Sequence, residues 1–113
     1  MITIRDIAAQ GDVLFRRISR LPDDVEEQPS SGRIVVAHSE TGHDHAIEDA
    51  EVRLFERMQR DPMICFLSVD GEFADVVHHR DHDTHAPLRL SKGLWEVRRQ
   101  REWTPEGFQH ARD

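Results

Sequence analysis

Short apolar runs, separated by residues that favour turns, make up most of the chain. Each run is rich in Val, Ile, Leu and Phe and is only a few residues long, which is typical of β-strands. Strands are therefore predicted at residues 11–19, 33–38, 52–55, 63–69, 73–79 and 94–103. The apolar run at residues 63–67 is unbroken, so we expect this strand to be central and covered on both faces.

The segments between the runs predict the connections. Asp70-Gly71 separates two of the predicted strands and is a strong signal for a tight hairpin, so the strands should form an antiparallel meander. Residues 21–32 combine Pro, acidic residues, Ser and Gly without an apolar period, which predicts an exposed mobile loop.

Helix signals are few. Thr104-Pro105-Glu106 supplies a capping residue and then a proline, so a short helix is predicted to start there and run into the C-terminus. Residues 2–9 are compatible with another short turn or helix. The fold class predicted from this pattern is mainly β, a small antiparallel β-barrel or sandwich with a short C-terminal helix.

Length and charge narrow the picture. A chain of 113 residues fits one domain, residues 1–113, with a single thin core. The formal net charge of -7 argues against a surface built to hold nucleic acid. Cys65, the one cysteine, cannot form an intramolecular disulfide and lies in the most apolar strand, where a buried inert thiol is expected. Without a signal-peptide pattern or a long apolar run, we expect a cytoplasmic protein that has no membrane association.

Histidine is the unusual component of the sequence. Seven of the eight histidines fall between His38 and His85. In a strand, residues two apart point to the same face, so His43 and His45 can hold one ion together. His82 and His85 are three apart, which suits a turn that leads into the next strand. The two pairs are about 40 residues apart, a separation that returns a meander to a neighbouring strand, and they predict one metal site formed by His43, His45, His82 and His85.

The residues around these pairs have weaker assignments. Glu40, His38 and His79 are candidates for orienting the ligands or replacing one of them. Solvated surface is nevertheless the favoured interpretation for four histidines, which are His38, His78, His79 and His110.

Neutral imidazole ligands select a transition metal such as Zn, Fe, Ni, Cu or Co over Mg or Ca. Four histidines would close a structural site, whereas three histidines and a water would form a catalytic one. Two alternatives therefore stay open beside a metal-binding protein. One is a metal-dependent enzyme that acts on a small-molecule substrate, and the other is a metal-free accessory or assembly module.

The sequence resembles two groups of proteins. Gly42-His43-Asp44-His45 followed by later histidines is similar to the cupin superfamily over roughly residues 33–97, which implies a β-barrel with a metal held by an HxH pair, a Glu and a distant His. Glu48 comes slightly early and Glu51 slightly late for that Glu, and the Pro-x-Gly turn of cupins is absent.

The closer resemblance is to small uncharacterised bacterial proteins and covers nearly the whole chain. The motifs that carry it are Gln10-Gly11-Asp12-Val13, Thr41-Gly42-His43-Asp44-His45, His82-Asp83-Thr84-His85-Ala86-Pro87 and Val97-Arg98-Arg99-Gln100-Arg101-Glu102. The resemblance implies that the four predicted histidine ligands act as one site, and it implies no particular activity.

The C-terminal part of the chain is basic, with a charge balance of +2 after residue 88 against -9 before it. Arg99 and Arg101 share a predicted strand face with Trp103, so one interpretation is a contact surface for an anion or a partner. The favoured interpretation is that these arginines pair with the acidic N-terminal part of the chain or of a second subunit. Nucleic acid is an unlikely partner, and a homodimer is plausible because so small a barrel has edge strands.

Overall fold

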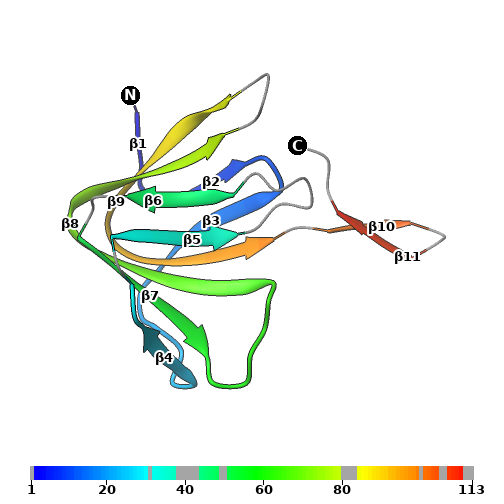
Figure 1. Cartoon of the computed structure of the whole chain (residues 1–113), viewed down its shortest axis with the longest axis horizontal. Helices are drawn as coiled ribbons and strands as arrows, with labels where there is room; N and C mark the ends of the chain where they lie inside the picture. The colour runs from blue at the N-terminus through cyan, green and yellow to red at the C-terminus, as the bar shows by residue number, and fades with distance from the viewer. Residues whose placement is uncertain are drawn as a thin grey trace.

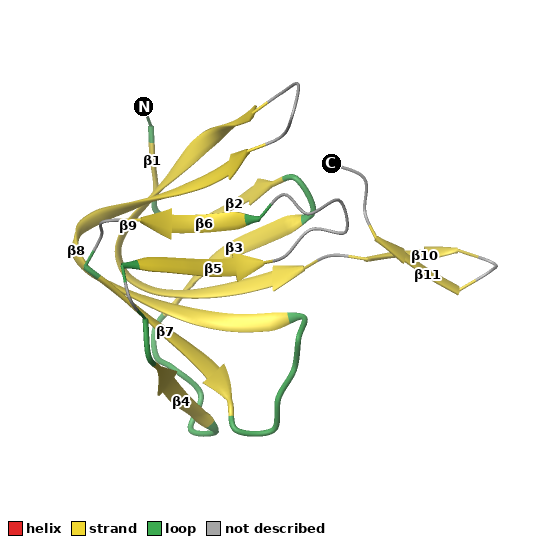
Figure 2. Cartoon of the chain, in the orientation of Figure 1, coloured by secondary structure: helices red, strands yellow, loops and turns green. Residues whose placement is uncertain are grey.

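The computed structural model describes residues 2–30, 32–37, 44–48, 51–79, 84–99, 101–104 and 107–110. Strands and connecting loops make up all of this part of the chain, which confirms the prediction of a mainly β fold (Figure 2). The main antiparallel sheet curls round on itself into a half-barrel (Figure 1). No helix in the described segments is long and apolar enough to cross a membrane.

The strands of the main sheet pair in the order β2-β3-β9-β8-β6-β5. At its flanks β1 pairs with β9 in parallel, and β7 lies between β4 and β8. A separate two-stranded sheet is formed by β10 and β11. The strands are β1 (Thr3–Ile4), β2 (Ile7–Gln10), β3 (Val13–Ile18), β4 (Val25–Gln28), β5 (Arg33–Ala37), β6 (His45–Glu48), β7 (Val52–Arg57), β8 (Ile64–His79), β9 (Thr84–Arg99), β10 (Arg101–Thr104) and β11 (Gly107–His110).

The long strands β8 and β9 give the sheet its curvature. Both strands bend in the middle and remain paired on either side of the bend (Figure 1). The pairing of Val69 with Gly93 is followed by that of Phe73 with Ser91, so residues 70–72 lie opposite Lys92 alone. These extra residues form a β-bulge, which bends a strand and increases its twist.

The hairpin predicted at Asp70-Gly71 is therefore wrong. The two residues lie at the bulge inside β8, and the strand continues to His79. Glycine and aspartate favour a bend in a strand for the same conformational reasons that they favour a hairpin turn, and the sequence signal does not separate the two.

Side chains of β7 and β8 and the backbone of Glu51, the residue before β7, hold this corner in place. The Arg53 guanidinium donates to both carboxylate oxygens of Asp70, at 2.8 and 3.2 Å, and the Ser68 hydroxyl donates to the same carboxylate at 2.7 Å. These hydrogen bonds, that from Arg53 first, hold the pKa of Asp70 below its ordinary value. The Asp70 N–H donates to the Glu51 carbonyl at 2.8 Å, which fixes the backbone as well.

Three further predictions about local structure differ from what is observed. Residues 21–32, predicted as a mobile loop, contain β4, whose backbone pairs with β7 and whose end is tied by an ion pair between Arg57 and Asp24. Residues 2–9 contain β1 and most of β2 in place of a turn or helix. The predicted C-terminal helix is replaced over Gly107–His110 by β11, which pairs with β10, while residues 105–106 and 111–113 lie outside the described part.

The core is formed by buried side chains from β3 and from β5 to β9 of the curled sheet. Alternate residues of β9 point inward, among them Trp95 and Val97, and they pack against Phe15 of β3 and Leu67 of β8. Residues 65–69 of β8 are all buried, so the prediction of a central strand covered on both faces is confirmed there. Trp95 also donates its indole N–H to the Ser91 carbonyl at 3.0 Å, so this large side chain is buried without losing its hydrogen bond.

Candidate functional site

A cluster of buried polar side chains lies among these apolar residues. Gln10 is 3% exposed, Asp12 is 5% exposed, and His45 and His78 are fully buried. The cluster draws on strands from different parts of the sheet order, with Gln10 at the end of β2, His45 at the start of β6 and His78 near the end of β8. Because polar groups in a core cost free energy unless they are paired, such a cluster is a candidate functional site.

Gln10 connects strands that lie apart in the sheet order. Its amide N–H donates to the Val76 carbonyl at 2.9 Å, and its amide oxygen lies 2.9 Å from Nδ1 of His45. Gly11, with φ of 61°, follows at once and turns the chain into β3, so Asp12 also comes to the cluster. The motif Gln10-Gly11-Asp12 thus brings two polar side chains to the buried site on either side of one turn.

This hydrogen bond fixes the tautomer of His45. The amide group of Gln10 is oriented by its donation to Val76, so the atom facing His45 is an oxygen, which can only accept. Nδ1 of His45 therefore carries the hydrogen, and Nε2 is left as the nitrogen with a lone pair in the neutral ring. A histidine that binds a metal through one nitrogen usually donates its other N–H in this way.

Asp12 lies on the Nε2 side of His45. One carboxylate oxygen is 3.7 Å from Nε2, and the other is 3.7 Å from the guanidinium of Arg99 at the end of β9. Arg99 thus pairs with the acidic N-terminal part of the chain, as the favoured interpretation of the basic C-terminal part expects. The arrangement places a carboxylate beside the imidazole lone pair, where a cation would be favoured.

The ring of His45 stacks on the ring of His78. The ring centroids are 3.8 Å apart and the planes are inclined by 20°. The stacking follows from the sheet register, since His45 is the Cα partner of His78 and His78 is in turn the Cα partner of His85. Three histidines therefore share one row across β6, β8 and β9. The backbones of His45 and His85 are separated by two strand spacings, roughly 10 Å.

The predicted ligands are described only in part. Of the four, His45 is buried in the cluster and His85 is in the histidine row, described by its backbone position. Within the part of the chain whose side chains are described, no three His, Cys, Asp or Glu side chains come together to hold an ion. His79, Arg101 and Trp103 are placed in strands without a description of their side chains, and the predicted site residues outside the described part are His38, Glu40, His43 and His82.

Sequence reasoning missed the central position of His78. We expected a solvated side chain, but His78 is fully buried. The strand alternation contained the signal, because Ala74, Val76 and His78 are spaced two apart and all three point to the core. Gln10 and Asp12 belong to the motif Gln10-Gly11-Asp12-Val13, but no local pattern in the sequence indicates that their side chains meet His45.

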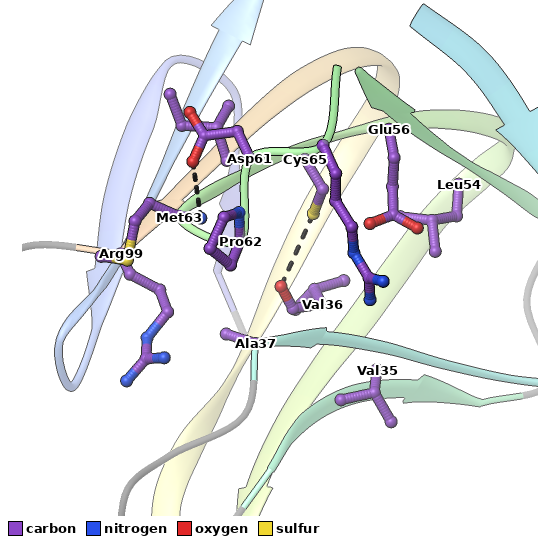
Figure 3. A pocket seen from close by; sticks show the side chains of 12 residues that line it. Val35, Val36, Ala37, Leu54, Glu56, Asp61, Pro62, Met63, Cys65 and Arg99 are labelled. Carbon is purple, nitrogen blue, oxygen red and sulfur yellow. Dashed lines mark hydrogen bonds between the residues drawn. The ribbon is translucent and has the colours of Figure 1, made fainter. Parts of the chain in front are cut away.

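A cavity of about 270 Å³ lies near this cluster, between the ends of β5 and β7 and the start of β8 (Figure 3). Arg99, which pairs with Asp12, lies on one side of the cavity, and Glu56 and Leu54 lie on the other. Cys65 forms part of the wall and its thiol points to the Val36 carbonyl at 3.5 Å. Burial raises the pKa of the Cys65 thiol to about 12, so the prediction of an inert buried cysteine is supported and a thiolate nucleophile is not available at neutral pH.

Comparison with known proteins places the chain in a family. The model of one family, described as a domain of unknown function (DUF8820), matches residues 9–100. That span includes Gln10, Asp12, His45, His78 and Arg99, so the whole described cluster lies inside the matched region. No curated protein and no solved structure matches the chain significantly. Because the family model covers most of the sequence, the chain belongs to the DUF8820 family.

Proposed function

We propose that this protein binds one transition-metal ion at the buried histidine row, with Nε2 of His45 as a ligand. The observation that carries the proposal is the hydrogen bond from Nδ1–H of His45 to Gln10, which presents the lone pair of Nε2 inside the protein. The Asp12 carboxylate, 3.7 Å from Nε2, would add attraction for a cation at this position.

The other ligands are proposed from the register and from the sequence. His78 stacks on His45, and His85 is the next residue in the row, so these two are the nearest candidates. His43, two residues before His45, and His82, three residues before His85, keep the role predicted for them. Imidazole nitrogens suit Zn, Fe, Ni, Cu or Co.

The first experiment measures metal in protein purified without an affinity tag. After reconstitution with each of these metals in turn and removal of the excess metal, we expect close to one equivalent of metal per chain by inductively coupled plasma mass spectrometry. The metal should also raise the Tm of the unaltered protein in a concentration-dependent way, because an ion that binds only the folded state stabilises it. This second measurement does not depend on any variant folding.

Variants then locate the site. His45→Gln should abolish binding, and His78→Gln should weaken it. His110→Gln is the matched control, because His110 belongs to β11 in the separate two-stranded sheet, and it should bind like the unaltered protein. Failure to bind any of the metals, with an unchanged Tm, would show instead that His45 and His78 are polar members of the core.

A further inference from the structure

The cavity between β5, β7 and β8 has two kinds of wall. One part is apolar and uncharged, and it includes Val36, Ala37, Leu54 and Cys65. The remaining wall is charged, with Glu56, Arg60, Asp61 and Arg99. Its volume of about 270 Å³ equals that of roughly nine water molecules, so it suits a small ligand below the size of most drug-like molecules.

Two of the four charged side chains are engaged within the protein. The Asp61 carboxylate accepts the Met63 N–H at 2.9 Å, and Arg99 pairs with Asp12. Glu56 and Arg60, in contrast, make no side-chain hydrogen bond or ion pair with each other or with any other described residue. The cavity therefore offers one negative and one positive group to a ligand.

Glu56 and Arg60 also mark the boundary with a second hollow. This neighbouring hollow, of about 260 Å³, is lined by the same two residues, by Met58 and by the polar side chains of Glu26, Gln28 and Arg57. The two charges thus lie where the apolar cavity meets a more polar region. A ligand with a charged head and an apolar tail would place its head at this boundary and its tail against Val36, Ala37 and Cys65.

We propose that this cavity binds a small zwitterion with an apolar side chain, of the α-amino acid type. Its ammonium group would donate to Glu56, its carboxylate would accept from Arg60, and its side chain would occupy the apolar part. Hydrogen bonds between groups that are both charged are stronger than those between neutral groups, so both ends contribute to recognition. The proposal does not depend on a metal at His45, and either proposal can fail without the other.

The test uses three probes that share the leucine side chain. L-leucine carries both charges, N-acetyl-L-leucine keeps only the carboxylate, and L-leucinamide keeps only the amine. Binding is followed by NMR shifts of the backbone amides at residues 35–37, 54–56 and 63–65. We expect saturable shifts at these positions with L-leucine, and affinity lower by about tenfold for each single-charge analogue, because each has lost one charged hydrogen bond.

Two variants assign the ends of the ligand. Glu56→Gln should weaken the binding of L-leucine and L-leucinamide by about tenfold and leave the binding of N-acetyl-L-leucine unchanged. Arg60→Gln should weaken the binding of L-leucine and N-acetyl-L-leucine and leave that of L-leucinamide unchanged. Arg20→Gln is the matched control, since Arg20 lies outside the cavity in an exposed ion pair with Asp23. Absence of shifts at the cavity up to the solubility limit of L-leucine would overturn the proposal, as would equal affinity for all three probes.

Discussion

The thiol of Cys65 illustrates how position controls the chemistry of a single residue. The side chain lies in the most apolar strand, contacts the Val36 carbonyl and lines a cavity without becoming reactive. Desolvation is the main cause of its raised pKa, and the nearby negative charge of Glu56 adds to it. Both effects disfavour the thiolate, so reagents that modify cysteine should react with the unfolded chain and hardly with the folded one.

The same pKa shift predicts a loss of stability in alkali. The thiol ionises near pH 9 in the unfolded chain and near pH 12 in the folded protein. The contribution of the protonated thiol to the free energy of unfolding is therefore fully present below pH 9 and is lost as the pH rises from 9 towards 12. At pH 10 the free energy of unfolding should be lower by about 1 kcal/mol. Urea unfolding at pH 8, 9 and 10 measures this decrease in the free energy of unfolding.

Composition makes this measurement specific to one group. The chain has no Tyr, and Lys92 is its single lysine, so few other groups titrate in this range. Cys65→Ala should therefore show a much flatter dependence of unfolding free energy on pH between 8 and 10. If the variant and the unaltered protein lose stability in parallel, the buried thiol is not the cause.

Single residues of the candidate site were predictable where the strand pattern reached them. His45 is predicted as a metal ligand because it lies two residues after His43, on the same face of an extended strand. Its burial agrees with a site that faces the core. The partner of His45 was not predictable, because Gln10 is 35 positions away and meets it only when the sheet curls. Long-range hydrogen bonds of this kind leave no local period in the sequence.

At the scale of elements, the corner of β8 and β9 depends on glycine. Gly93 has a φ of 136°, which side-chain-bearing residues rarely adopt, and a Cβ at this position would collide with the guanidinium of Arg17. Gly71 lies in the bulge of the paired strand without such a constraint, and its Cβ would lie 3.4 Å from the Cβ of Glu51. The two glycines are close in the fold but differ in what they require.

Gly93→Ala should therefore destabilise the protein by about 1–3 kcal/mol, because the backbone strain remains even if Arg17 moves aside. Gly71→Ala, the control at the same corner, should change stability by less than about 1 kcal/mol. Chemical denaturation of both variants gives the comparison. Equal losses would mean that crowding at the corner matters and the positive φ does not.

The elements themselves were predicted unevenly for a physical reason. Apolar runs such as residues 63–69 gave strands close to the observed ones, since a buried strand needs continuous apolar side chains. β4, with the sequence VEEQ, was missed because its two glutamates are exposed and it is held by backbone pairing with β7. The sequence predicts β8 as two shorter strands, residues 63–69 and 73–79, because a bend and a turn use the same residues. For β9 it predicts only a strand at residues 94–103, which covers the second part of the observed strand.

For the whole molecule, Gln10 is the contact that links distant strands. β2 lies at one end of the sheet order, whereas β6 and β8 lie toward the other, and the Gln10 amide bonds to both His45 and Val76. Gln10→Met keeps a side chain of similar length but leaves the Nδ1–H of His45 and the Val76 carbonyl without this partner in the interior. Stability should fall by about 1–3 kcal/mol.

Gln28→Met provides the matched control for that substitution. Among the described residues, the Gln28 amide makes only a local, exposed hydrogen bond to the Glu26 carbonyl, so its loss should change stability by less than about 0.5 kcal/mol. Thermal and urea unfolding of both variants would be compared with the unaltered protein. A loss for Gln10→Met no larger than for Gln28→Met would mean that the sheet keeps its curl without this link.

The unbroken passage of β8 and β9 through the corner also determines how the molecule opens. Each of these strands contributes backbone hydrogen bonds to both halves of the curled sheet. Opening one half would therefore disturb the hydrogen bonds of the other half. Transient opening should consequently involve both halves together as one cooperative unit. Amide protons at Leu67 and at Val76, on opposite sides of residues 70–72, are expected to exchange with solvent through the same event and at similar protection, as in a single folding unit and unlike two lobes on a hinge.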